Sequence, residues 1–107
     1  MATPDQVADS LLRIEAELRA LDLWSRTEPP EHALQSTQPF AVDTLLFTEW
    51  LQFVFLPRMK DLIEADRPLP STSGIAPMAE EHFRGLDLSG DALIRELMLI
   101  DRLLSGA

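Results

Sequence analysis

The side chains best suited to chemistry lie in two carboxylate–imidazole clusters. Glu28, Glu31 and His32 form the first cluster, and Glu80 to His82 form the second. A carboxylate beside an imidazole can transfer a proton or bind a metal ion. Neither cluster has the H-x3-H or H-E-x-x-H spacing that brings two histidines around a zinc ion. We therefore predict that both histidines lie at the surface, and that the chain has no metal site and no cofactor.

Other reactive residues occur singly, without partners. Ser71, Thr72 and Ser73 precede Gly74, but no base is identifiable for their hydroxyl groups, so the segment is typical of a flexible loop. Glu49 is the acid that a strongly apolar run flanks, and a carboxyl group in such surroundings can act as an acid or a base. One acid does not make a mechanism, and a capping or hydrogen-bonded glutamate is the alternative. The four glycines form no phosphate-binding loop and no nucleophile elbow.

Charge and composition narrow the classes of function. The chain has 107 residues, 18 of them acidic and 9 basic, for a net charge of -9. Such a chain repels phosphate backbones, so direct binding of nucleic acid is disfavoured. It has no cysteine, and its first ten residues lack the basic-then-apolar pattern of a signal peptide. We predict one cytoplasmic domain over residues 1–107, with no segment long enough to span a membrane.

The elements that must position these residues are predicted to be helices. Thr3, Pro4 and Gln6 form the start of a first helix with a capping box. Its apolar residues recur at intervals of four and three, which is typical of one buried helix face. The last helix follows Ser89 as its N-cap and has the same spacing. The two stripes are Val7, Leu11, Ile14, Leu18 and Leu21 in the first helix, and Leu93, Leu97, Ile100 and Leu104 in the last.

Shorter helices are expected between these two. One helical turn should begin at Pro30 and run through Leu34, and a short helix should run from Pro77 to Phe83, where Gly85 stops it. No segment alternates apolar and polar residues over the length of a strand. The predicted fold class is therefore all-α, a compact bundle of four to five helices.

The central segment, residues 44–64, is apolar nearly all round. Asp43 is expected to cap its helix, and Pro57 to break or kink it, because proline lacks the N–H that an interior position needs. We predict that Trp50 and Phe53 lie in the core, and that both halves face it. An innermost core helix and a surface shared with a second chain both account for so much apolar surface. Before the proline, the face expected to be buried consists of Leu46, Phe47, Trp50, Phe53 and Val54.

Several short motifs, taken together, resemble those of the YqcC family, a small bacterial family with a DUF446-type domain. The resemblance implies an all-helical bundle. It also implies an association with tRNA pseudouridine synthase C, beside which members of the family are commonly encoded. Phe47-Thr48 departs from the family pattern where the central helix starts. The matching segments are Ser36 to Phe40, Asp43-Thr44, Glu49 to Gln52, Pro57 to Met59, Pro68 to Pro70, Trp24 to Pro29 and Ile75 to Pro77.

The resemblance does not imply that this chain is the synthase itself. Such synthases are larger, mixed α/β enzymes with a catalytic aspartate in an H-R-L-D motif. The segment HFRGLD, from His82 to Asp87, has a similar composition. However, Phe83 and Gly85 break the spacing, and no strand is predicted beside it. We interpret this similarity as chance.

The residues and the resemblance together predict a non-catalytic accessory protein that binds a tRNA pseudouridine synthase. A proline-fixed loop loses little entropy on docking, and aromatic and arginine side chains are frequent at binding hot spots. For Phe40, the alternative is an anchor that pins the loop to the core. The candidate contact residues are Gln38, Pro39, Phe40, Asp43 and Arg58.

Three other interpretations remain open at this point. A small ligand-binding or enzymatic helical domain would hold Glu49 in an apolar pocket. A homodimer would bury the surplus apolar surface of the central helix. Direct binding to tRNA is the third, against which the net charge argues.

Overall fold

Helical segments make up the regular structure of the chain. The computed structural model describes residues 3–70, 74–86 and 89–105. No strand occurs in these ranges, so the predicted all-α fold is confirmed. In chain order the elements are α1 (Pro4–Ala20), α2 (Glu31–Leu34), η1 (Pro39–Ala41), α3 (Phe47–Trp50), η2 (Leu51–Phe55), α4 (Leu56–Glu64), α5 (Ile75–Arg84) and α6 (Asp91–Ser105).

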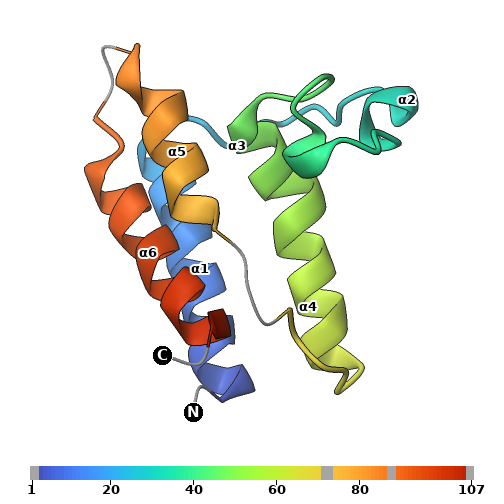
Figure 1. The fold of residues 1–107 in the computed structure, drawn as a ribbon, viewed down its shortest axis with the longest axis vertical. Coiled ribbons are helices and arrows are strands. Elements are labelled where there is room, and N and C mark those ends of the chain that lie inside the picture. Colours follow the sequence, from blue (N-terminus) through green and yellow to red (C-terminus); the bar gives the residue numbers. More distant parts are fainter. Residues whose placement is uncertain (1–2, 71–73, 87–88, 106–107) are drawn as a thin grey trace.

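The helices form two groups that share one core. α6 packs against both α1 and α5, while α3, η2 and α4 follow one another as a single central helix. This central helix lies alongside the first group (Figure 1), where α4 contacts α1 and α3 contacts α5. The small elements α2 and η1 lie at the α3 end of the central helix. The main cluster of buried side chains draws on α1, α5, α6 and the central helix.

The helices predicted from local pattern are confirmed, although α6 begins at Asp91, so Gly90 and not the predicted N-cap Ser89 directly precedes it. At the start of α1, Thr3 Oγ1 accepts from the Gln6 N–H at 3.2 Å, and Gln6 Oε1 accepts from the Thr3 N–H at 3.0 Å. The apolar stripes of α1 and α6 are buried, apart from Leu21, which is half-buried just beyond α1. α2 follows Pro30 as expected, and α5 is capped by Gly85 but begins two residues earlier than predicted.

The start of α5 depends on a residue from α6. The Ile75 and Ala76 N–H groups donate to the two carboxylate oxygens of Asp101, at 2.9 and 2.8 Å. The carboxylate thereby satisfies two of the free N–H groups at this terminus and lies against the positive end of the helix dipole. Gly74, directly before, has a φ of 67°, a left-handed conformation that glycine adopts at little cost. Asp101 thus joins α5 to α6 by polar contacts as well as by packing.

The irregularity expected at Pro57 is a π-helical turn, and the helix is not broken. Helical backbone angles continue through Phe55 (φ -67°, ψ -54°) and Leu56 (φ -61°, ψ -46°). The Leu56 N–H donates to the Leu51 carbonyl, five residues back instead of four. Pro57 has no N–H, and its ring crowds the carbonyl four residues earlier, so a turn with a different bonding pattern before it accommodates the ring. Both halves contribute to the same core, as predicted.

The orientation predicted for the central helix is wrong except at Phe47, which is buried in the main core as expected. Leu51, Phe55 and Leu56 are buried in the main core, whereas Phe53 is half-buried and outside both clusters of buried residues that the structure describes. Trp50 is also only half-buried, although it packs against the core. The inward side carries two polar side chains as well: Thr48 and Gln52 are both buried, and a hydropathy-weighted helical wheel turns such residues outward.

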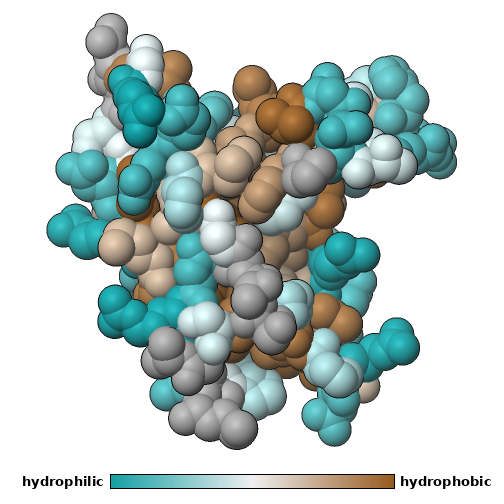
Figure 2. All heavy atoms as spheres, viewed as in Figure 1, coloured by the Kyte–Doolittle hydropathy of each residue, from teal (hydrophilic) through white to brown (hydrophobic). Residues whose placement is uncertain are grey.

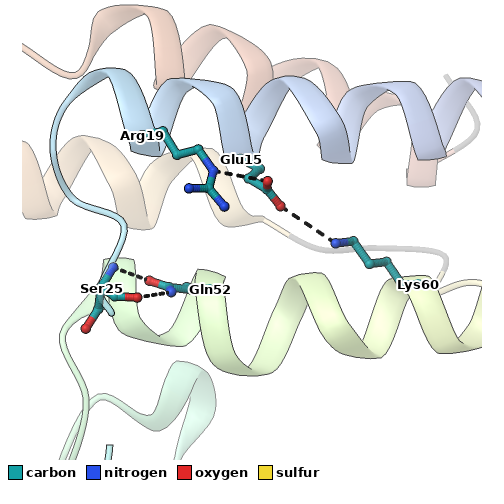
Figure 3. A network of polar contacts seen from close by, with 5 residues as sticks. All are labelled: Glu15, Arg19, Ser25, Gln52 and Lys60. Carbon is teal, nitrogen blue, oxygen red and sulfur yellow. Dashed lines mark hydrogen bonds and ion pairs between the residues drawn. The ribbon is translucent and has the colours of Figure 1, made fainter. Parts of the chain in front are cut away.

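Two sets of polar contacts hold the central helix in this orientation (Figure 3). The Gln52 side chain accepts from the Ser25 N–H at 2.8 Å and donates to the Ser25 carbonyl at 2.7 Å. Glu15 on α1 lies 3.7 Å from Lys60 Nζ on α4, and within α1 it also pairs with Arg19 Nε at 3.2 Å. The ion pairs are partly exposed and worth no more than about 1 kcal/mol each. The buried Gln52 contacts are therefore the stronger constraint.

None of the helices in the described residues is both long and apolar enough to cross a membrane.

Gly90, just before α6, is buried against the Phe83 ring. A methyl group there would lie 2.6 Å from Phe83 Cδ2, and Phe83 belongs to the main core. We expect Gly90→Ala to lower the free energy of unfolding by about 1–3 kcal/mol through overpacking. Gly85→Ala is the matched control, because a methyl group at Gly85 meets nothing within 4 Å, and it should change stability by no more than about 0.5 kcal/mol. Urea unfolding followed by circular dichroism measures both, and equal effects would contradict the packing described.

Candidate functional site

Residues 36–45, which contain most of the predicted contact residues, fold into a turn held by short-range hydrogen bonds. Ser36 Oγ donates to Asp43 Oδ1 at 2.5 Å and accepts from the Gln38 N–H at 3.1 Å. Thr44 Oγ1 donates to the Ala33 carbonyl at 2.7 Å, which ties the turn to α2. The Ala41 carbonyl accepts from two backbone N–H groups further along the turn. The segment is therefore ordered by its own side chains.

Phe40 and Ala41 adopt a strained backbone conformation within this turn. Their φ values are 58° and 50°, and left-handed angles cost a residue with a Cβ about 1–2 kcal/mol. The geometry brings the Phe40 ring against Trp50, with 4.8 Å between ring centroids in an edge-on arrangement. Phe40 is half-buried there and packs against the main core. The structure thus gives Phe40 the contacts of an anchor, while part of its ring stays exposed.

A row of rings runs from this turn across α3 to α5. Beyond Phe40, Trp50 stacks with Phe47 at 6.2 Å between centroids, and Phe47 lies 5.9 Å from the His82 ring on α5. His82 in turn meets the Phe83 ring edge-on at 5.1 Å. Rings in such arrangements contribute beyond their buried area. The row therefore fixes the turn, α3 and α5 relative to one another.

Apolar side chains remain exposed next to this row. Val42 and Leu46 are 63% and 61% exposed, and Trp50 and Phe53 are half-buried. Leu46, Trp50 and Phe53 follow the 4-3 spacing of one helix face, and Val42 lies in the turn four residues before Leu46. Figure 2 shows apolar surface gathered over α3 and the adjoining part of α5, between hydrophilic flanks. We call Val42, Leu46, Trp50 and Phe53 the α3 face.

Burial against aromatic rings lowers the pKa of the His82 imidazole, because the charged form loses its hydration there. The unfolded chain then binds a proton at His82 more tightly than the folded chain does. Stability should therefore fall as the pH drops from the usual histidine pKa of about 6.5 to the lowered value in the folded state.

His82→Gln should remove part of this loss of stability between pH 7.5 and 5.5. His32→Gln is the control, because His32 is exposed on α2. Urea unfolding at the two pH values measures the difference for each variant. A His82→Gln variant with the same pH dependence as the parent would show that His82 titrates normally.

The structure brings together four of the five predicted contact residues. Gln38 and Asp43 are exposed, Pro39 opens η1 beside Phe40, and all four lie in the turn. The prediction that Asp43 caps the central helix is wrong: its carboxylate accepts from Ser36, and α3 begins later, at Phe47. Arg58 is exposed on α4, eleven residues past the start of α3, or about 16 Å along the helix axis. It does not share the turn with the others.

Glu49 is the residue that opens α3. Its Oε1 accepts from the Leu46 N–H at 2.8 Å, which satisfies one of the free donors at the start of the helix. The side chain is half-exposed. Of the two roles considered for Glu49, a helix-capping residue or an acid in an apolar pocket, the geometry favours the capping role.

The two carboxylate–imidazole clusters do not assemble into a larger site. His32 is exposed, as predicted, but His82 is half-buried among aromatic rings, so the prediction of a surface residue is only partly right. Within the described ranges, no group of three or more histidine, aspartate or glutamate side chains is arranged to hold a metal ion. Ser71 to Ser73 and Asp87 lie outside the described residues.

Comparison with known proteins agrees with this fold and with the motifs in the sequence. A model of the DUF446 family, described as tRNA pseudouridine synthase C, matches residues 6–103. The chain belongs to the DUF446 family. YqcC of Escherichia coli (strain K12), described as uncharacterized, is 45% identical over 80 residues, which cover 75% of this chain and 73% of YqcC. The solution NMR structure of Escherichia coli YqcC superposes with a TM-score of 0.79 at 38% identity, covering 98% of this chain and 90% of that one.

A second relative has a different layout. It is a tRNA pseudouridine synthase C of Pectobacterium carotovorum subsp. carotovorum, 39% identical over 85 residues. The matching segment covers 79% of this chain but only 23% of that protein. An uncharacterized protein of Haemophilus influenzae is 38% identical over 77 residues. The matching segment covers 73% of that protein, the same share as in YqcC. Segments similar to this chain therefore occur both as most of a short protein and as a minor part of a longer one.

Proposed function

We propose that this protein is a non-catalytic partner of a tRNA pseudouridine synthase. The observation that carries the proposal is the Pectobacterium relative, in which a segment similar to this chain forms 23% of a longer protein named tRNA pseudouridine synthase C. Joining two modules in one chain replaces a bimolecular encounter by an intramolecular one, which is useful when the modules act together. A separate chain of this family would make the same contact by association.

The charge of the chain supports a protein partner over RNA. An enzyme that acts on tRNA needs a basic surface for the phosphate backbone, and this chain carries a net charge of -9. Opposite net charges speed the encounter of two proteins and help to orient them. We place the partnership in the cytoplasm and assign it to a single domain over residues 1–107. We propose that the synthase contacts this protein at the turn and at Arg58 on α4. The contact residues in the turn are Gln38, Pro39, Phe40 and Asp43.

The decisive experiment measures pseudouridine in tRNA with the synthase alone and with this protein added. We expect the two purified proteins to form a complex at about micromolar concentration. We also expect the added protein to raise the rate at which the synthase forms pseudouridine, or to increase the number of different tRNAs that it modifies. The protein without synthase should produce no pseudouridine. If no complex forms and the synthase modifies tRNA equally well in both conditions, the proposal is wrong.

A further inference from the structure

We infer that the α3 face is the docking surface for the synthase, and that it binds an apolar patch with basic residues around it. This inference rests on the proposed function. It extends the proposed contact surface from the turn to the α3 face, and it adds the chemistry of the patch that the α3 face meets. Val42 and Leu46 would be the two side chains that lose most exposed area on binding, because they are 63% and 61% exposed in the free protein.

The first argument is the placement of apolar residues on the central helix. Its inward side, with Leu51 and Phe55, already fills the core. Its outward side nevertheless continues with Leu46, Trp50 and Phe53 at helical spacing, where a solvated helix normally carries charges. Apolar patches of this kind on a protein surface commonly mark a contact with another protein. The turn with strained Phe40 and Ala41 holds one edge of the patch in place, so little order has to be gained on docking.

The second argument is charge, which favours a basic protein over a second copy of this chain as the partner that binds the α3 face. From Glu28 to Pro57 the sequence contains four acidic residues and no lysine or arginine; the acids are Glu28, Glu31, Asp43 and Glu49. This stretch runs from α2 through the turn and α3 to the end of η2, so these elements contribute carboxylates and no lysine or arginine to the surroundings of the α3 face. A second copy of this chain would bring two such acidic surfaces together, which is unfavourable. A basic surface is complementary, and a protein that binds tRNA has one.

The structure offers closely matched variants for the test. Val42→Ser and Leu46→Ser remove apolar contact at exposed positions, and Leu12→Ser is the control, because Leu12 is 62% exposed on α1 beside the far half of α4. Calorimetry with the purified synthase measures the dissociation constant for each variant. We expect Val42→Ser and Leu46→Ser each to weaken binding about tenfold, equivalent to about 1.4 kcal/mol, and Leu12→Ser to leave it unchanged. Val42→Ser and Leu12→Ser should unfold like the parent, and Leu46→Ser should be at least as stable, because Leu46 is the N-cap of α3 and serine is favoured at that position.

A second set of variants tests the charge. Glu28→Gln and Glu31→Gln should slow association and make binding less sensitive to salt, because exposed charges act mainly on the encounter rate. Glu64→Gln, at the exposed end of α4, should do neither. Association rates at about 50 and 300 mM salt show the difference. Equal salt dependence in all three variants would contradict the basic partner.

The outcomes separate this inference from the proposed function. If the synthase binds and Val42→Ser and Leu46→Ser behave like Leu12→Ser, the partnership stands and the α3 face is not the contact. If the parent protein shows no binding at about 10 μM, the proposed function fails and this inference fails with it. If the parent protein instead forms a dimer that Leu46→Ser dissociates, a second copy occupies the face and the inference is wrong.

Discussion

Leu51→Ala should lower the free energy of unfolding by about 3–5 kcal/mol. The Leu51 side chain is fully buried in the main core, and its truncation leaves a cavity that the neighbouring side chains fill only in part. A domain of this size has a total stability of about 5–15 kcal/mol, so the variant should lose a large share of it. Urea unfolding followed by circular dichroism measures the change.

Phe53→Ala is the control for Leu51→Ala, on the same helix and two residues further on. Phe53 is half-buried and lies outside the described core clusters, so its truncation should cost no more than about 1.5 kcal/mol. A helical wheel drawn from hydropathy predicts the opposite order. If Phe53→Ala proves more costly than Leu51→Ala, the central helix is turned the other way from the structure described here.

Gln52→Ala should lower the free energy of unfolding by about 2–4 kcal/mol. The substitution removes two hydrogen bonds to Ser25, at 2.8 and 2.7 Å, from a side chain that is only 7% exposed (Figure 3). A buried polar group left without its partner costs about 1–3 kcal/mol, and Ser25 is half-buried, so water replaces only part of what is lost. Chemical denaturation compared with the parent protein tests this value.

Two further variants show whether hydrogen bonding is the cause. Gln52→Glu keeps an acceptor for the Ser25 N–H but sets a carboxylate oxygen against the Ser25 carbonyl, so it should also destabilise at neutral pH. Gln38→Ala removes an exposed glutamine and should change stability by no more than about 0.5 kcal/mol. A Gln52→Ala variant as stable as Gln38→Ala would mean that the contact with Ser25 does not hold the central helix.

The two sides of the central helix have different consequences if the α3 face binds the synthase as proposed. Leu51 and Gln52 face inward, and their substitution should change stability. Leu46 faces outward at the N-cap of α3, and its replacement by serine should change binding without destabilising the protein. Phe53, half-buried on the outward side, should affect binding more than stability. Measuring stability and binding on variants of these four residues would therefore show whether the inward side determines stability and the outward side determines binding.

The sequence by itself was sufficient for the all-α fold, for α1 and α6 with their buried stripes, and for membership of the family. These features rest on local interactions. The capping box of α1 joins Thr3 to Gln6, three residues apart, and the stripe spacing follows from the pitch of one helix. The family motifs are likewise short segments read directly from the chain. Such signals do not depend on what a helix packs against.

Only the tertiary structure decided how the central helix is turned, what opens α5, and which apolar residues stay exposed. The central helix is apolar on nearly every side, so its hydropathy is consistent with more than one orientation. The contacts that choose one join residues far apart: Gln52 with Ser25, 27 positions away, and Asp101 with Ile75, 26 positions away. Polar groups such as Gln52 are buried because a distant backbone satisfies them, and that partner is known only once the chain is folded. The exposure of Leu46 and Val42 is likewise a property of the folded chain, because no other helix of the described structure covers them.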